Sequence, residues 1–171
     1  MIMKEVKLYS ILIVLFAVLV SAKAPTPAKS SSLQIKGYVF KDDKKLDNAK
    51  VKLYQNNKIV QIAKTKNSKF EFILFSDLRY MVEVSMDGCV TERIQISTLE
   101  KTEYAGKYLY EFRVDLMDLS EFKGVDISDL DFPTALIKYN SEEGEYLHDE
   151  DYSKSVRKQL KALQTEAKGK K

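Results

Sequence analysis

The sequence predicts an all-β fold: a seven-stranded antiparallel Greek-key β-sandwich, followed by an acidic extension and a C-terminal amphipathic helix. Three observations support this prediction. Apolar and polar residues alternate in one short segment after another between residues 33 and 118. Turn-like clusters rich in Asn, Asp and Gly separate these segments. Each segment has one apolar face, which is typical of antiparallel sheets, whereas buried parallel strands read as continuous apolar runs.

Residues 1–24 have the features of a secretory signal peptide. Lys4 and Lys7 form a positive start, residues 10–20 are an apolar run, and residues 22–24 supply small side chains for a cleavage site. A cleaved signal is favoured over an uncleaved anchor, because a membrane span needs ~20 apolar residues. No cysteine lies directly after the apolar run, where a lipoprotein would have one. We therefore expect an exported protein, periplasmic or at the cell surface or extracellular, that is not a lipoprotein.

The overall charge gives no sign of a nucleic-acid partner. The formal net charge is +3, and it falls to +1 when the three lysines and one glutamate of residues 1–24 are removed. Proteins that bind nucleic acid usually carry a clustered basic face. The sequence therefore favours other classes of partner.

The elements follow in order along the chain. Residues 25–32 are rich in Pro and Ser and are expected to form a linker. The sandwich domain is expected over residues 33–118. Its strands are predicted at residues 33–39, 50–53, 59–63, 70–74, 82–86, 93–96 and 110–116.

Residues 119–148 are expected to form the acidic extension. Between residues 115 and 151, twelve acidic residues stand against two lysines. Within the extension, residues 135–139 and 145–147 predict a short hairpin, because a turn-like segment separates two strand-like ones.

Residues 149–167 predict the helix, and residues 168–171 a disordered tail. An apolar stripe recurs along the helix at helical spacing: Val156, Leu160, Leu163 and Ala167. A short isolated helix is marginal in water. We therefore expect the stripe to pack on the rest of the protein while the lysines face the acidic extension. The alternative is a free basic helix on an anionic membrane, which the absence of Trp and Phe in this segment disfavours.

Residues 35–98 contain a set of core and turn residues with recognisable spacing. The set is Ile35-x-Gly37-x-Val39, Asn48-Ala49-x-Val51-x-Leu53, Lys69-Phe70-x-Phe72, Tyr80-x-Val82-x-Val84 and Asp87-Gly88. It resembles the carboxypeptidase regulatory-like domain, a transthyretin-like sandwich common in exported bacterial proteins. Ser68 and Cys89 depart from the family, which usually has glycine and an aromatic residue there. The extension is similar to those of small exported proteins of Bacteroidetes type. The resemblance implies a fold and no particular active site.

The sequence offers few groups for catalysis. Hydroxyisourate hydrolases share the transthyretin fold, but their site needs several histidines, and this chain has a single one, His148. One histidine also falls short of the usual zinc site with three protein ligands. We therefore predict no catalytic residue, no cofactor and no enzymatic activity. His148 is expected at the surface or where the helix begins.

Two sets of residues are candidates for a binding role. Calcium favours clustered oxygen ligands, and the candidate ligands in the extension are Asp126, Asp129 and Asp131. Their spacing does not match an EF-hand loop, so a solvated acidic loop is the favoured interpretation. Tyr38 and Phe40 form a candidate binding surface on the strand face opposite Ile35. The favoured alternative is that the extension covers both rings, because its own apolar residues need a place to pack.

Cys89 is the only cysteine, so no internal disulfide can form. We expect it to be a small buried apolar residue rather than a reactive thiol.

These observations favour an exported, non-catalytic module that binds or scaffolds in the cell envelope. A carbohydrate- or peptide-binding accessory domain of a separate enzyme is the second hypothesis, and an uncharacterised hydrolase is the third. The expected partner is an envelope protein or a glycan, and membrane contact is not favoured.

Overall fold

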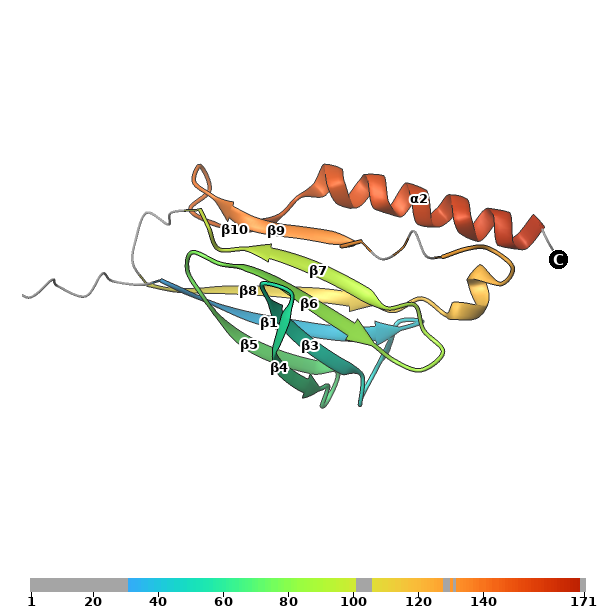
Figure 1. Cartoon of the computed structure of the whole chain (residues 1–171), viewed down its shortest axis with the longest axis horizontal. Coiled ribbons are helices and arrows are strands. Elements are labelled where there is room, and N and C mark those ends of the chain that lie inside the picture. The colour runs from blue at the N-terminus through green and yellow to red at the C-terminus, as the bar shows by residue number, and fades with distance from the viewer. Residues whose placement is uncertain (1–30, 101–105, 128–129, 131, 170–171) are drawn as a thin grey trace, which may run out of the picture.

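The computed structural model describes residues 31–100, 106–127, 130 and 132–169. Within them the chain forms two packed β-sheets and a long C-terminal helix that lies along one side of the sandwich (Figure 1). The all-β sandwich with a C-terminal helix is therefore confirmed. The elements are β1 Ser32–Lys41, β2 Lys44–Lys45, β3 Lys50–Gln55, β4 Lys58–Lys64, β5 Lys69–Phe75, β6 Arg79–Ser85, β7 Glu92–Ser97, β8 Lys107–Asp115, the 3₁₀ turn η1 Leu119–Phe122, β9 Ala135–Asn140, β10 Glu145–His148 and α2 Glu150–Gly169.

The first sheet is built around β1. β5 and the short β2 pair with it antiparallel, and β8 pairs with it in parallel. Alternate residues of β1 point into the core, as the sequence pattern predicts. Gly37 belongs to this inward face, and the ring of its partner Phe70 lies so close that a Cβ at residue 37 would overlap it. The glycine thus makes room for an aromatic ring in the core.

The second sheet has the order β10-β9-β7-β6-β3-β4. Its inward residues meet those of the first sheet in one core that includes Ile35, Phe72, Val82 and Ile96. The hairpin expected in the acidic extension is present, and β9 adds to β7, so the hairpin extends this sheet. The polar face of β6 and its neighbours carries an ion-pair network, in which Glu83 binds Lys52 at 2.7 Å and Arg93 at 3.2 Å.

Two details of the predicted sandwich need correction. The part of the chain that the structure describes contains ten strands rather than seven, because β2, β9 and β10 join the sheets. The sheets are also not purely antiparallel, since β8 runs parallel to β1 and β9 runs parallel to β7. The alternation pattern reports which face of a strand is buried, and it carries no information on the direction of the neighbouring strand.

A second, smaller core lies under α2. Val156 and Leu160 of the helix pack with Val90, Phe122 and Leu130, and Leu163 contacts the same cluster. The apolar stripe of the helix is therefore folded back onto the protein, as predicted. Asp149 begins the helix: its carboxylate accepts a hydrogen bond from the Tyr152 amide at 3.0 Å.

Of the extension's apolar residues, Phe122, Ile127, Leu130 and Phe132 thus pack under α2, and Ile137 and Tyr139 join the main core. The predicted signal peptide, and the predicted linker up to residue 30, lie outside the described residues. Of the predicted disordered tail, residues 168 and 169 belong to α2, and residues 170–171 lie outside the described part. In the described chain, no helix combines the length and apolar character that a membrane span requires.

Candidate functional site

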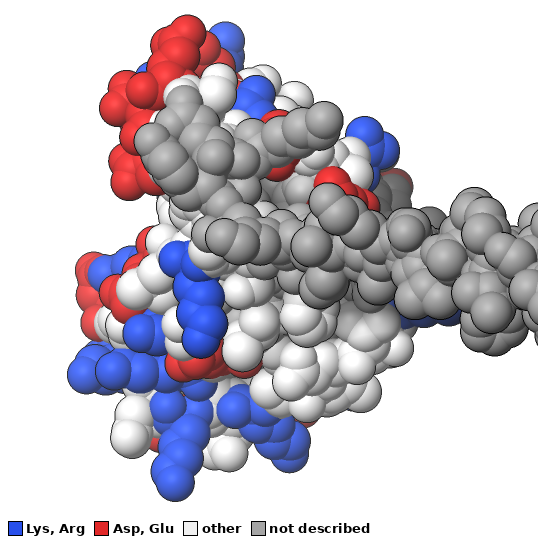
Figure 2. All heavy atoms as spheres, turned by 90° about the vertical axis from the view of Figure 1, so that its left-hand side faces the viewer, with Lys and Arg blue, Asp and Glu red and all other residues white. Residues whose placement is uncertain are grey.

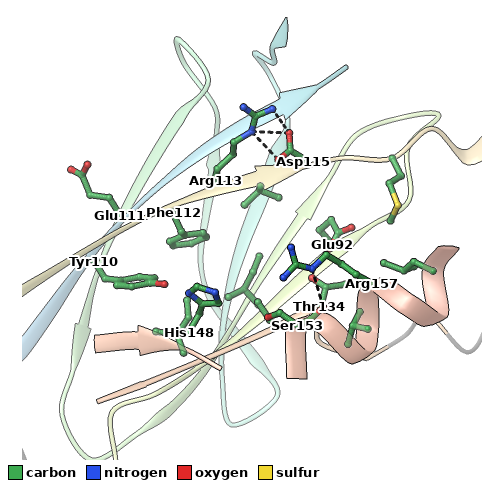
Figure 3. Close-up of a pocket in the computed structure, with 17 residues that line it drawn as sticks. Glu92, Tyr110, Glu111, Phe112, Arg113, Asp115, Thr134, His148, Ser153 and Arg157 are labelled. Atoms are coloured by element: carbon green, nitrogen blue, oxygen red, sulfur yellow. Dashed lines mark hydrogen bonds and ion pairs between the residues drawn. The ribbon is translucent and has the colours of Figure 1, made fainter. Parts of the chain in front are cut away.

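A cleft of about 530 Å³ opens where α2 crosses the side of the sandwich (Figure 3). It is lined by β8 of the first sheet, by β7 and β9 of the second sheet, and by α2. β8 is the edge strand of its sheet, so residues from both of its faces reach the cleft. Apolar side chains from both sheets and α2 form its walls, and they include Ile94, Phe112, Val114, Ile137, Val156 and Leu160. Charged side chains also reach it, among them Glu111, Arg113, Asp115 and Arg157.

Glu92 is the polar residue that stands out in this cleft. It opens β7 and points inward, on the same face as Ile94 and Ile96, and it is only 7% exposed. Burial raises the pKa of Glu92 to about 7, and the nearby charge of Asp115 adds to this rise. The carboxyl group therefore changes between neutral and charged near neutral pH.

Thr134 is the polar neighbour of Glu92. Its hydroxyl donates to the carbonyl oxygen of Arg93 at 3.1 Å, and it also lies within hydrogen-bonding reach of the Glu92 carboxyl. This hydrogen bond lowers the pKa of Glu92 and so opposes part of the rise that burial causes. The pKa is still raised, because burial is the larger effect.

Ser153 and Arg157 lie beside Glu92 on the first turns of α2 (Figure 3). The Ser153 hydroxyl is buried and has no hydrogen-bond partner among the described residues. Arg157 Nε donates to the Ser153 carbonyl oxygen at 3.2 Å, which fixes its side chain along the helix. The cleft thus contains a buried hydroxyl without a partner, a pattern that marks a site where a ligand or water binds.

His148 lies at the opposite end of the cleft, beside Tyr110 (Figure 3). It is the last residue of β10 and is exposed, just before Asp149 begins α2. This is the surface and helix-start position that the sequence predicts. Ser153 and His148 both line the cleft, but they do not form a Ser–His pair, because the Ser153 hydroxyl has no hydrogen-bond partner in the described structure.

The expectation that the extension covers Tyr38 and Phe40 is wrong. Both rings are half-buried on the outer face of the first sheet, where cations from neighbouring strands cover them. Lys69 lies 5.3 Å from the centre of the Tyr38 ring, and Arg113 lies 4.1 Å from that of Phe40. The extension packs under α2 instead, because the apolar stripe of the helix provides its partner surface. Whether Tyr38 and Phe40 bind a ligand stays a prediction.

Of the other candidate residues, Asp126 and Cys89 do not line the cleft. Asp129 and Asp131 lie outside the described residues, so the calcium hypothesis stays a prediction. Among described residues, no group of three or more His, Cys, Asp or Glu side chains is arranged to hold a metal ion. Cys89 is half-buried against the edge of the main core rather than fully buried.

Sequence reasoning missed Glu92, Thr134, Ser153 and Arg157. A signal for Glu92 was present: the alternation of Ile94 and Ile96 with polar residues, continued by one step, places an acid at a core position. The other three come from a loop and a helix. The pairing of β9 with β7 brings Thr134 to Glu92, and the packing of α2 brings Ser153 and Arg157 there.

No protein-family model matches the sequence, and the search of curated proteins gives no match. Several solved structures are similar to part of it. The Bacillus anthracis TIE protein is 18% identical, with a TM-score of 0.42, over 52% of this chain and 17% of that chain. Catechol 1,2-dioxygenase from Acinetobacter is 15% identical, with a TM-score of 0.40, over 65% of this chain and 60% of that chain. A DUF3823 family protein from Parabacteroides merdae is 14% identical, with a TM-score of 0.35, over 52% of this chain and 47% of that chain.

These likenesses are weak and assign neither a family nor a function to this chain. The chain spans 17% and 60% of the lengths of the first two proteins, so it corresponds to a part of each. Membership of the carboxypeptidase regulatory-like family is not supported by a family model.

The prediction that the chain is not an enzyme needs correction. Solved structures similar to this chain include dioxygenases and a dioxygenase domain. The lack of a familiar catalytic motif therefore does not show that the chain is not an enzyme. The identities of 15%, 13% and 10% assign no activity to this chain.

Proposed function

We propose that this protein is an exported binding domain of the cell envelope whose cleft, completed by α2, takes a small amphipathic ligand. One observation carries the proposal: a carboxyl group and an unpartnered hydroxyl are buried together in a cleft of about 530 Å³ that also has apolar walls. Ligand pockets are typically about 300–1,000 Å³, mostly apolar, with a few convergent polar groups.

The arrangement of the polar groups indicates the kind of ligand. Ser153 offers a hydroxyl, and Glu92 offers a proton donor below a pH of about 7 and an acceptor above it. The apolar side chains of the lining, such as Ile94 and Leu160, suit a hydrocarbon or aromatic body of the ligand. The favoured ligand therefore has an apolar body and one end that both donates and accepts hydrogen bonds.

Binding of the fluorescent anion anilinonaphthalene sulfonate tests the cleft. Ala135 is half-buried in its lining, and Ala135→Phe fills it. We expect this variant to lower the affinity for the dye roughly tenfold or more, because the dye loses the apolar volume it occupies. Ala162→Phe, the same substitution at an exposed position of α2, is the matched control and should bind like the parent. Equal affinity of both variants would place the dye elsewhere and contradict the proposal.

The same dye reports on Glu92. Ionisation of this carboxyl adds a negative charge to the cleft, so the affinity for an anion should fall as the pH rises through about 7. Glu92→Gln should bind the dye with no such fall. A pH profile that is the same in parent and variant would mean that the dye does not occupy the part of the cleft beside Glu92.

Export is the second half of the proposal, and its support is the signal-like pattern of residues 1–24. We expect N-terminal sequencing of the protein from the envelope fraction to begin between residues 22 and 25. A full-length chain that remains with the membrane would instead support an anchor.

A further inference from the structure

β4 is an edge strand that is exposed and apolar. It ends the second sheet and pairs with β3, and its other edge carries no strand among the described residues. Six of its seven residues are exposed. Its three largest apolar side chains are about half exposed: Ile59 48%, Val60 51% and Ile62 57%. Such an edge presents unpaired backbone groups that can add a strand from another chain.

The surroundings of this edge are strongly basic. Between residues 44 and 69 the sequence has eight lysines and one acidic residue, Asp47. Lys58 and Lys64 stand at the two ends of β4, and Lys50 pairs with Lys64 across the sheet. Within the described residues, these three lysines form no ion pair. Figure 2 shows the segregation on one face: lysines and arginines gather in the lower part, at the height of β3–β5, and acidic side chains gather at the top.

We propose that β4 binds an extended acidic segment of a partner protein by β-strand addition. The added strand would take its backbone hydrogen bonds from the free edge of β4. Apolar or β-branched side chains at its centre would cover Ile59 and Ile62, which would otherwise stay half exposed. Acidic residues at its two ends would meet Lys58 and Lys64. The charges of the edge therefore select the partner, and the free backbone groups bind it.

Two features of β4 limit which strands can pair with its free edge. The first is a bulge: Val60 has no partner on β3, because the pairing shifts register between Leu53 and Tyr54. A bulge bends the edge strand and limits unspecific pairing. The second is the flanking lysines, which disfavour pairing with strands that have no acidic residues. These features favour a partner of matched charge over a second copy, whose own β4 edge would bring the same lysines together.

A labelled synthetic peptide tests the proposal on the full chain. The peptide has about nine residues, alternating Val and Thr at the centre and Glu at both ends, so that it matches the length of β4. We expect fluorescence anisotropy to show binding that weakens as salt is raised, because the end charges are exposed. Lys58→Glu with Lys64→Glu should lower the affinity about tenfold or more. Lys158→Glu with Lys161→Glu, which changes the same charge on the exposed side of α2, should leave it within about twofold.

A second peptide separates strand addition from charge attraction alone. N-methyl groups on alternate amides remove the hydrogen bonds of one peptide edge and leave its charge unchanged. Two such peptides, methylated on opposite edges, are compared. We expect the peptide whose methylated edge faces β4 to lose binding, and the other to keep it. Equal binding of both, or equal binding by the Lys58/Lys64 and Lys158/Lys161 variants, would overturn the proposal. A dimer of the parent chain that the Lys58/Lys64 substitutions dissociate would also overturn it, because a second copy would then occupy the edge.

Discussion

Phe72→Ala is expected to lower the free energy of unfolding by about 3–5 kcal/mol, because it removes a buried ring and leaves a cavity. Phe72 is among the largest side chains that are fully buried between the sheets, with 2% exposure. Its ring also packs against Phe70, at 5.7 Å between ring centres. Urea unfolding followed by circular dichroism measures the effect, and the slope of the transition shows whether the variant still unfolds in a single step.

The neighbouring residue provides the control. Ile73 lies on the opposite face of β5 and is 58% exposed. Ile73→Ala should change the free energy of unfolding by less than about 0.5 kcal/mol. Effects of equal size at residues 72 and 73 would mean that the register of β5 against β1 is wrong by one residue.

Glu92→Gln is expected to stabilise the protein by about 3 kcal/mol at pH 8, because the parent must bury a charged carboxylate there. The sign follows from the raised pKa, about 7 in the folded protein against 4.5 for an ordinary glutamate. Below the lower value both states are protonated, and Glu92 contributes no pH dependence. Between the two values the unfolded chain loses the proton first, so the stability of the parent falls as the pH rises. Above about 7 the difference from the variant is constant.

Unfolding of the parent and Glu92→Gln at several pH values between 4.5 and 8 measures this difference. Glu143→Gln, at the exposed turn between β9 and β10, controls for the loss of one negative charge. Carbon NMR of the Glu92 carboxyl gives a direct second readout, with a titration midpoint expected near 7. A variant that is less stable than the parent across the whole pH range would show instead that Glu92 is ionised and held by a cation.

An acid that destabilises the fold at neutral pH is informative about function. Buried charged groups are usually paired, because burying an unpaired charge is costly. Among the described residues Glu92 forms no ion pair, and it lies beside Thr134 and the unpartnered Ser153 hydroxyl. Perturbed ionisable groups in a cleft are candidates for binding or chemistry. The cleft is therefore the place to search for a ligand.

Much of the sandwich could be predicted from local pattern. The burial of alternate residues in β1, β5 and β7 follows directly from the period of two, since each strand has one face toward the core. The stripe on α2 follows in the same way from the period of the helix. The pattern was also sufficient for the β9–β10 hairpin. It left open which strands become neighbours, because pairing depends on contacts between segments far apart in the chain.

The sequence by itself therefore determined the elements, their buried faces and the return of α2 to the protein, since each depends on residues a few positions apart. The tertiary structure decided the two parallel pairings, the exposure of β4 and the composition of the cleft. Glu92 shows the reason: its position in β7 predicts that it points inward, but its raised pKa arises only because β8, β9 and α2 remove it from water. Burial by distant segments is a property of the assembled fold, and no local pattern encodes it.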